Sequence, residues 1–536
     1  MRDITREWAL YSSLCILLML IIMSYQSITS RTGGILVYGS DDVYIHMAVA
    51  KNLVLHGVWG VTRYGFTSST SSIIWPLMIS LVYKVFGVNN ITPLVFNVIL
   101  SILLVFYAYR LSGRYVAGQS LRFMLLLSLI LFLPLPLLVF NGLEHVLHIL
   151  LTLLFAFYSA IALSKNVVSS RECYYLYALA PLMTMTRYES MMTIGIVSLL
   201  FLLRRRPMVS LALFSAGVLP IIVYGVVSMG NGWFFLPNSL ILKGGLHQDV
   251  SSHPTVVGRL IVWFTVGVIR SLMTTQTLVI LLAVLFLLKK YQWDGFHWSE
   301  VVVLAAVFTL NIVAHFFSVH AVVNRYDAYL IALGFFVITA QLGLNVLEKK
   351  RMSIRSTLRV LEEHPLLILV LVFSIQNGLW TLQIGQISGN IYQQQYQMGV
   401  FLSEYYANRT VALVDVGFAN YLTDLRCVDL YGLADMDAAN AKSGGYYTMG
   451  EVDRITSGKG VEIAVLFDNQ FIRNNVSIIP AGWTKVGSWK IEDNVICGDD
   501  DITFYSVKDS SRKQLIDDLR AYSPRLPKEV IQEYGF

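Results

Sequence analysis

Long apolar runs recur along the chain, and they limit what it can fold into more than any other feature. The first covers residues 8–28, and several later runs also reach the roughly 20 apolar residues that a helix needs to cross a bilayer. Hydrophobic residues make up 55% of the 536 residues and charged residues 14%, whereas soluble chains carry about 25% charged residues. This excludes a mainly soluble enzyme, a disordered protein and a nucleic-acid binder, despite the net charge of +6. We expect a polytopic α-helical membrane protein.

Charge divides the chain into two parts. Residues 1–383 carry 26 Lys and Arg against 14 Asp and Glu, whereas residues 384–536 carry 14 against 20. We therefore expect a basic transmembrane domain over residues 1–383 and an acidic soluble domain over residues 384–536. The second part is long enough to bury a core of its own.

Clusters of basic residues indicate which side of the membrane each loop occupies, because cytoplasmic loops are enriched in Lys and Arg. The clusters are Arg110/Arg114/Arg122, Lys165/Arg171, Arg204/Arg205/Arg206, Lys289/Lys290 and residues 349–359. They predict about eleven spans in the plasma membrane, with the N-terminus inside, an uncleaved signal-anchor first and residues 384–536 outside. The first outer loop is expected over residues 29–92, with residues 73–86 as an interfacial or re-entrant helix.

This topology leaves few acids on the outer side. The six are Asp41, Asp42, Glu144, Glu189, Asp249 and Asp327. An ionisable residue beside a span is costly, so each is a candidate functional group. Asp41 and Asp42 would begin a helix at the membrane interface, with Ser40 as N-cap and Gly57 as C-cap. The alternative is that both are ordinary first-turn acids, although repulsion between adjacent carboxylates favours a raised pKa and general-base chemistry.

Several segments resemble the GT-C superfamily of membrane glycosyltransferases, and most closely the cell-wall terminal β-arabinofuranosyltransferases. The first-loop match is Asp-Asp-Val-Tyr-Ile at residues 41–45, with Lys51 and Asn52, and Thr-Ser-Ser at residues 70–72 before Trp75. Later matches are Gly-Leu-Glu at 142–144, Arg-Tyr-Glu at 187–189, Leu-Pro-Asn-Ser at 236–239, Arg-Tyr at 325–326, Asp-x-Gly at 415–417 and Asp-Leu-x-Gly-Leu at 429–433. All of these lie on the outer side of a topology that was derived from charge alone.

The resemblance implies a polyprenyl-phosphate-linked sugar as donor and direct displacement with inversion at the anomeric carbon. It assigns the general base to Asp41, with Asp42 as second choice or orienting partner. Arg187, Arg325 and Lys243 are the candidates for the donor phosphate, since Arg is suited to bidentate phosphate contact. The alternative for the two arginines is a structural pair with Glu189 and with Asp327.

Further residues are candidates for substrate contact, with ion pairs, caps or packing as the alternative. They are Glu144, Glu189, Tyr44, Lys51, Ser71 and Asn238. No obligatory metal is expected, although Asp41 and Asp42 have the chemistry to hold a divalent cation. The acceptor is expected to be a hydroxyl of a cell-envelope glycan, a lipid or a protein. The rival functions are a polyprenyl-linked sugar flippase or transporter and a non-catalytic envelope-assembly scaffold.

The soluble part is expected to be a mixed α/β domain. Residues 411–416, 462–467 and 503–507 have the pattern of short buried strands, and the chain after residue 510 that of a helix. Trp483, Trp489 and the pair Tyr446 and Tyr447 could stack on sugar rings, although core packing is the favoured alternative. Cys427 and Cys497 are either a disulfide in an oxidising compartment or two free thiols.

Overall fold

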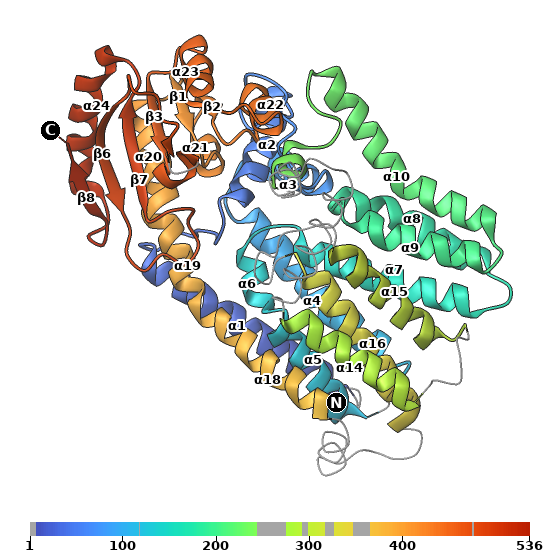
Figure 1. Cartoon of the computed structure of the whole chain (residues 1–536). Helices are drawn as coiled ribbons and strands as arrows, with labels where there is room; N and C mark the ends of the chain where they lie inside the picture. The colour runs from blue at the N-terminus through green and yellow to red at the C-terminus, as the bar shows by residue number, and fades with distance from the viewer. Residues whose placement is uncertain are drawn as a thin grey trace. The chain divides into compact units, whose positions relative to one another are not determined.

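The computed structural model describes residues 7–116, 118–243, 275–291, 298–316, 326–346, 365–473 and 476–535 (Figure 1). The chain forms two compact units. Unit 1 comprises residues 1–24, 94–223 and 244–382, and unit 2 comprises residues 25–93, 224–243 and 383–536. Residues 29–92, the predicted first outer loop, therefore belong to the same compact unit as the C-terminal domain.

Among its described residues, unit 1 contains helices joined by short connections and no strand. Its helices are α4 (Thr92–Ser112), α5 (Gln119–Phe132), α6 (Leu135–Phe140), α7 (His145–Ser164), α8 (Ser170–Thr186), α9 (Ser190–Leu203), α14 (Thr275–Tyr291), α15 (Glu300–Phe316), α16 (Ala328–Val346) and α18 (Pro365–Trp380), with most of α1 (Trp8–Arg31) and α10 (Pro207–Gly230). Within the described ranges, five helices are long and apolar enough to span a membrane, namely α1, α4, α7, α10 and the run Ile368–Tyr405. Six further apolar helices are shorter.

The position of α7 explains why it is apolar on every side. It packs against α8, α15 and α16, and side chains around its whole circumference are buried. By contrast, α10 exposes apolar side chains such as Leu211 and Val226. A helix that is apolar all round is typical of a membrane protein, in which lipid covers the faces that protein does not.

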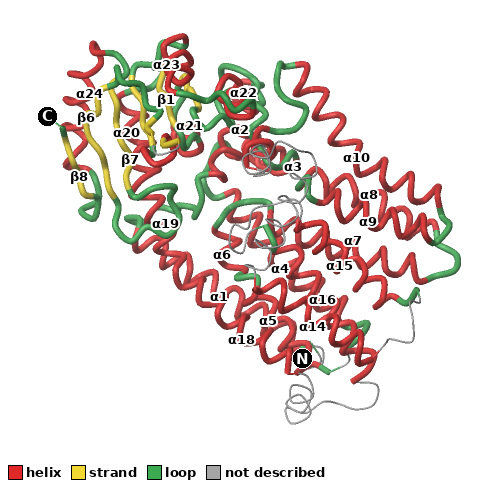
Figure 2. The backbone as a smooth tube through the Cα atoms, in the orientation of Figure 1, coloured by secondary structure: helices red, strands yellow, loops and turns green. Residues whose placement is uncertain are grey.

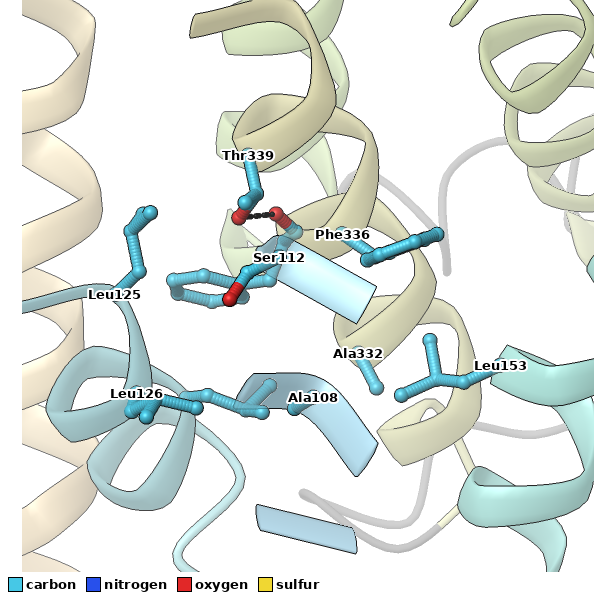
Figure 3. Close-up of a pocket in the computed structure, with 10 residues that line it drawn as sticks. Ala108, Ser112, Leu125, Leu126, Leu153, Ala332, Phe336 and Thr339 are labelled. Atoms are coloured by element: carbon cyan, nitrogen blue, oxygen red, sulfur yellow. Dashed lines mark hydrogen bonds between the residues drawn. The ribbon is translucent and has the colours of Figure 1, made fainter. Parts of the chain in front are cut away.

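A small apolar cavity lies among the helices of unit 1 (Figure 3). Ala108 of α4, Leu126 of α5, Leu153 of α7 and Phe336 of α16 line it. The Thr339 hydroxyl beside it donates to the carbonyl of Phe335 at 2.8 Å, as hydroxyls within helices commonly do. None of the lining side chains is titratable, so this cavity is not a candidate for the chemistry.

The strands that the structure describes all belong to unit 2 (Figure 2). The strands of the main sheet are β1 (Thr410–Leu413), β2 (Arg426–Asp429), β3 (Ile463–Leu466), β6 (Thr484–Lys490), β7 (Asp501–Ser506) and β8 (Ile531–Tyr534), in the order β2-β1-β3-β7-β6-β8. The first three are parallel and the last three join antiparallel. The predicted strands correspond to β1, β3 and β7, and the predicted C-terminal helix is α24 (Asp509–Tyr522).

The core of unit 2 uses the aromatic residues that were candidates for sugar stacking. Trp489 is 1% exposed, and its ring packs against Phe401, Phe504 and Tyr522. Trp483 and Tyr447 are also buried. Core packing is therefore the role that the structure gives all three, whereas Tyr446 is exposed.

The segment predicted as the first outer loop contributes two helices to unit 2, α2 (Asp42–His56) and α3 (Ile74–Phe86). The Ser40 hydroxyl accepts the N–H of Asp42, the first residue of α2, at 3.3 Å, which is the capping bond that the sequence predicted. The expected interfacial position of α2 is wrong. Residues 43–52 are all buried, because α2 packs against α3 and against α21 (Gly417–Leu422), so it does not lie on a membrane surface.

Other features of the loop agree with its sequence. Gly57 ends α2 in the left-handed conformation, with φ of 68°, which glycine adopts without strain. The Ser72 hydroxyl accepts the N–H of Trp75 at 3.2 Å at the start of α3. With 13 residues, α3 is shorter than the roughly 20 that a membrane span requires.

Candidate functional site

Asp41, the predicted base, is bound by the backbone of the C-terminal domain. Its two carboxylate oxygens accept N–H groups from Gly417 at 2.7 Å and from Phe418 at 2.8 Å, at the start of α21. A Cβ atom on Gly417 would lie 2.2 Å from the carbonyl oxygen of Asp41, far inside van der Waals contact. Glycine is therefore needed here for the close approach, and the Asp-x-Gly and Asp-Asp motifs meet through it.

Two further residues of α2 strengthen this contact. The ring of Tyr44 packs on that of Phe418, with centroids 3.7 Å apart, and its hydroxyl accepts the N–H of Tyr38 at 3.0 Å. The ammonium of Lys51 donates to the carbonyl of Asn420 at 2.8 Å and lies 3.6 Å from Asp424. Both side chains are buried against protein, so the structure gives them a role in holding α2 onto α21.

A second pair of matched motifs also meets in unit 2. The side-chain amide of Asn238, at the start of α11 (Asn238–Lys243), donates to the carbonyl of Gly432 at 2.8 Å. The backbone N–H of Asn238 donates to the carbonyl of Ser68 at 2.8 Å. The buried Asp429 shapes the turn that receives Asn238, because its carboxylate accepts three backbone N–H groups from residues 431–434. Asn238 thus connects the Ser/Thr-rich loop to the Asp-Leu-x-Gly-Leu turn.

The electrostatic surroundings of Asp41 suit a group that exchanges a proton. The pKa of Asp41 is raised to about 8, first by burial and next by the negative charge of Asp415, whereas the adjacent Asp42 has a smaller effect. The two backbone N–H groups act in the opposite direction, because they favour the ionised carboxylate. A carboxyl with a pKa near the working pH is matched to general-base catalysis.

Asp415 was quoted as part of a motif but not predicted as a site residue. Its carboxylate accepts the side-chain amide of Gln395 at 2.8 Å. Gln395 lies in a π-helical turn, Tyr392–Tyr396. Such turns are rare in proteins overall, and those that occur are often found at functional sites. The signal in the sequence was the spacing Asp415-x-Gly417, which does not reveal that Asp41 lies opposite.

Metal binding was the other chemistry considered for Asp41 and Asp42. In the part of the chain that the structure describes, no group of three or more His, Cys, Asp or Glu is arranged to hold a metal ion. Since both oxygens of Asp41 accept backbone N–H groups, we do not propose Asp41 and Asp42 as metal ligands.

A separate charged cluster lies in unit 1 and joins three helix ends. The guanidinium of Arg187, after α8, donates to Glu144 before α7 at 2.8 Å and to Glu189 before α9 at 2.7 Å and 3.2 Å. The Tyr326 ring lies 5.0 Å from the guanidinium carbon. The side chain of Arg187 is only 4% exposed and that of Glu144 is fully buried. The pair of Arg187 with Glu189 is the one that was predicted as the alternative to phosphate binding, and Glu144 is a second partner.

The remaining predicted residues are placed as follows. Asp42 and Ser71 are half-buried in unit 2, and Lys243 is the last residue of α11. Asp327 is buried just before α16. Arg325 and Asp249 lie outside the described residues, and with them the predicted pair of Arg325 and Asp327.

Cys427 and Cys497 are free thiols, and burial raises the pKa of both. We expect an alkylating reagent to leave both unlabelled in the native protein, because a thiol with a raised pKa holds little thiolate. Both are expected to react after unfolding without any reductant, as measured by mass spectrometry of peptides. Labelling that requires a reductant would instead show that the two form a disulfide.

Comparison with known proteins supports the architecture. A domain family of unknown function, DUF8728, matches residues 387–505, which cover most of the C-terminal domain. No functionally curated protein sequence matches the chain. The structure is similar to the crystal structure of ArnT from Cupriavidus metallidurans bound to undecaprenyl phosphate, with a TM-score of 0.51 and 11% identity over 92% of this chain and 98% of ArnT.

This likeness shows the fold. The chain is a polytopic helical membrane protein of ArnT-like architecture with a C-terminal α/β domain, which confirms the predicted class. The count of eleven spans, the orientation in the membrane and the arabinofuranosyltransferase resemblance stay predictions.

Proposed function

We propose that this chain is a GT-C glycosyltransferase that transfers a sugar from a polyprenyl-phosphate-linked donor to an acceptor hydroxyl on the outer face of the plasma membrane. The observation that carries the proposal is the fold shared with ArnT over 92% of the chain, since that structure holds undecaprenyl phosphate. The chemistry of Asp41 supports it, because a transferase of this kind needs one carboxylate to receive the acceptor proton.

The residues have distinct roles in the proposed reaction. The acceptor oxygen attacks the anomeric carbon while Asp41 takes its proton, and the bond to the phosphate oxygen breaks with its electron pair leaving on the phosphate. Such a displacement inverts the anomeric centre. Lys243 and Arg325 are proposed for the departing phosphate, where cations stabilise developing negative charge. Arg187 is already bound by two glutamates, and we propose that it stabilises the fold of unit 1.

The test is transfer by the purified full chain in lipid. It would be supplied with a panel of synthetic polyprenyl-phosphate sugars, including an arabinofuranosyl donor, and with cell-envelope glycans, lipid and protein as separate acceptors. We expect a sugar-bearing acceptor and an equal amount of free polyprenyl phosphate, both detected by mass spectrometry. Activity with one acceptor class alone would identify the substrate.

A transport assay addresses the rival function. The same protein would be placed in vesicles whose fluorescent polyprenyl-phosphate sugar is initially in one leaflet. Movement of intact donor between leaflets, with no donor cleaved under any acceptor, would contradict the proposal and favour a flippase. Cleavage and transfer without accelerated movement would support it.

A further inference from the structure

Asp415 lies two residues before Gly417, whose N–H binds Asp41 in a contact between segments far apart in the sequence. Asp415 lies between the end of β1 and the start of α21, and two residues later Gly417 donates its N–H to Asp41. Its negative charge is the largest influence on the pKa of Asp41 after burial itself. Residues 415–418 thus supply both the N–H groups that bind Asp41 and the negative charge that raises its pKa.

Asp415 is itself held in place from another element. The side-chain amide of Gln395 donates to Asp415 and also to the side chain of Gln394 at 3.1 Å. The thiol of Cys497 donates to the side-chain oxygen of Gln395 at 3.4 Å, which leaves the NH2 group directed at Asp415. A donor directed at a carboxylate favours its ionised form. The π-helical turn therefore holds the carboxylate of Asp415 in place.

We propose that Asp415 is a positioning residue for Asp41, so that the C-terminal domain completes the transfer site rather than only covering it. The inference rests on the proposed function in that Asp41 receives the acceptor proton. An ionised Asp415 makes Asp41 a stronger base, and the N–H groups of Gly417 and Phe418 fix the direction of its carboxylate. Asp415 touches neither donor nor acceptor in this scheme.

Several titratable groups interact electrostatically with Asp41, so each affects the pH range in which Asp41 titrates. They are Asp42 and Tyr44 on α2, Asp415, Cys427 on β2 and Cys497 between β6 and β7. The folded-state pKa of Asp41 is raised from 3.8 to about 8, so the folded protein holds a proton that the unfolded chain releases across that window. Its contribution to the stability of the fold therefore declines as the pH rises from about 4 to about 8.

The test compares Asp415→Asn with Asp453→Asn, which removes the same charge from an exposed residue of α23 (Met449–Gly458) in the same domain. Two pH profiles would be measured on the full chain in lipid, the initial rate of transfer and the thermal unfolding midpoint. We expect Asp415→Asn to move the midpoint of the rate profile down by about one pH unit or more, since a nearby like charge shifts a carboxyl pKa by that order. Asp453→Asn should leave it where it is in the wild type.

The unfolding profile needs no substrate, so it separates this inference from the proposed function. The effect of Asp415→Asn on the pH dependence of unfolding should vanish when Asp41→Asn is already present, because the two residues act on each other. If Asp415→Asn fails to fold, Gln395→Met serves instead and should shift both profiles in the same direction by less. Unchanged pH profiles in both variants would overturn the inference even if the wild type transfers sugar.

Discussion

Replacing Asp41 with Asn is expected to lower kcat/KM for sugar transfer by about a hundredfold or more, the scale of a lost general base. Asn cannot take the acceptor proton, and its amide would oppose one of the two N–H donors at the start of α21. The measurement is the initial rate of transfer with the donor and acceptor found for the wild type. The unfolding temperature would be recorded beside it, so that loss of the α2–α21 contact is recognised as such.

Asp42→Asn is the matched comparison, because it removes the same charge one residue along the chain. Asp42 is half-buried in the first turn of α2, and it raises the pKa of Asp41 by less than Asp415 does. We expect a loss of transfer much smaller than that of Asp41→Asn. A hundredfold loss in Asp42→Asn with little change in Asp41→Asn would assign the base to Asp42 instead.

The pH dependence of the wild type follows from the same group. With the pKa of Asp41 raised to about 8, the base form is the minority at pH 6 and becomes the majority above pH 8. The rate of transfer should therefore rise across this interval and level off beyond it. The residual rate of Asp41→Asn should show no such rise.

The second large effect is expected from Arg187→Met, and it concerns stability. This change leaves Glu144 and Glu189 in unit 1 without the cation that both contact. Breaking a buried ion pair by removing one partner costs about 3–5 kcal/mol, because an uncompensated charge stays buried. We expect a large drop in the thermal unfolding midpoint of the protein in detergent.

Two further variants decide how the Arg187 result is understood. Arg171→Met changes an exposed arginine in the first turn of α8, the helix that Arg187 follows, and should lower the midpoint only slightly. Combining Arg187→Met with Glu144→Gln and Glu189→Gln removes the stranded charges and should restore most of the loss. If that combined variant regains stability but still lacks transfer, the result would favour phosphate binding by Arg187 and contradict the structural role proposed for it.

Local patterns predicted the class of fold because they carry their own physical reason. Apolar runs must be helical in a bilayer, and short buried strands such as β1 and β3 show a continuous apolar pattern. The contacts between motifs could not be predicted in this way, since nothing in the sequence around Asp41 indicates that the N–H of Gly417 will bind it. The resemblance named both segments, but only the folded chain shows that they touch.

The errors have equally specific causes. The interfacial placement of α2 rested on a few apolar positions, yet residues 43–50 are apolar on nearly every side, which is typical of a buried helix. The pair of Arg187 with Glu189 was predicted correctly because the two are neighbours in sequence, but the structure adds a contact with Glu144. Glu144 lies 43 residues away, and no periodic pattern connects them. Asp415 was missed for the same reason.

The contact between Asp41 and Gly417 also has a consequence for how the protein is made. The two residues are 376 positions apart, and at about 5–20 residues per second the ribosome needs roughly 20–75 s to pass from one to the other. During that interval α2, buried along residues 43–52 in the finished protein, has no α21 to cover it. Residues 43–52 must therefore wait for a segment of the chain that is synthesised 376 positions after Asp41.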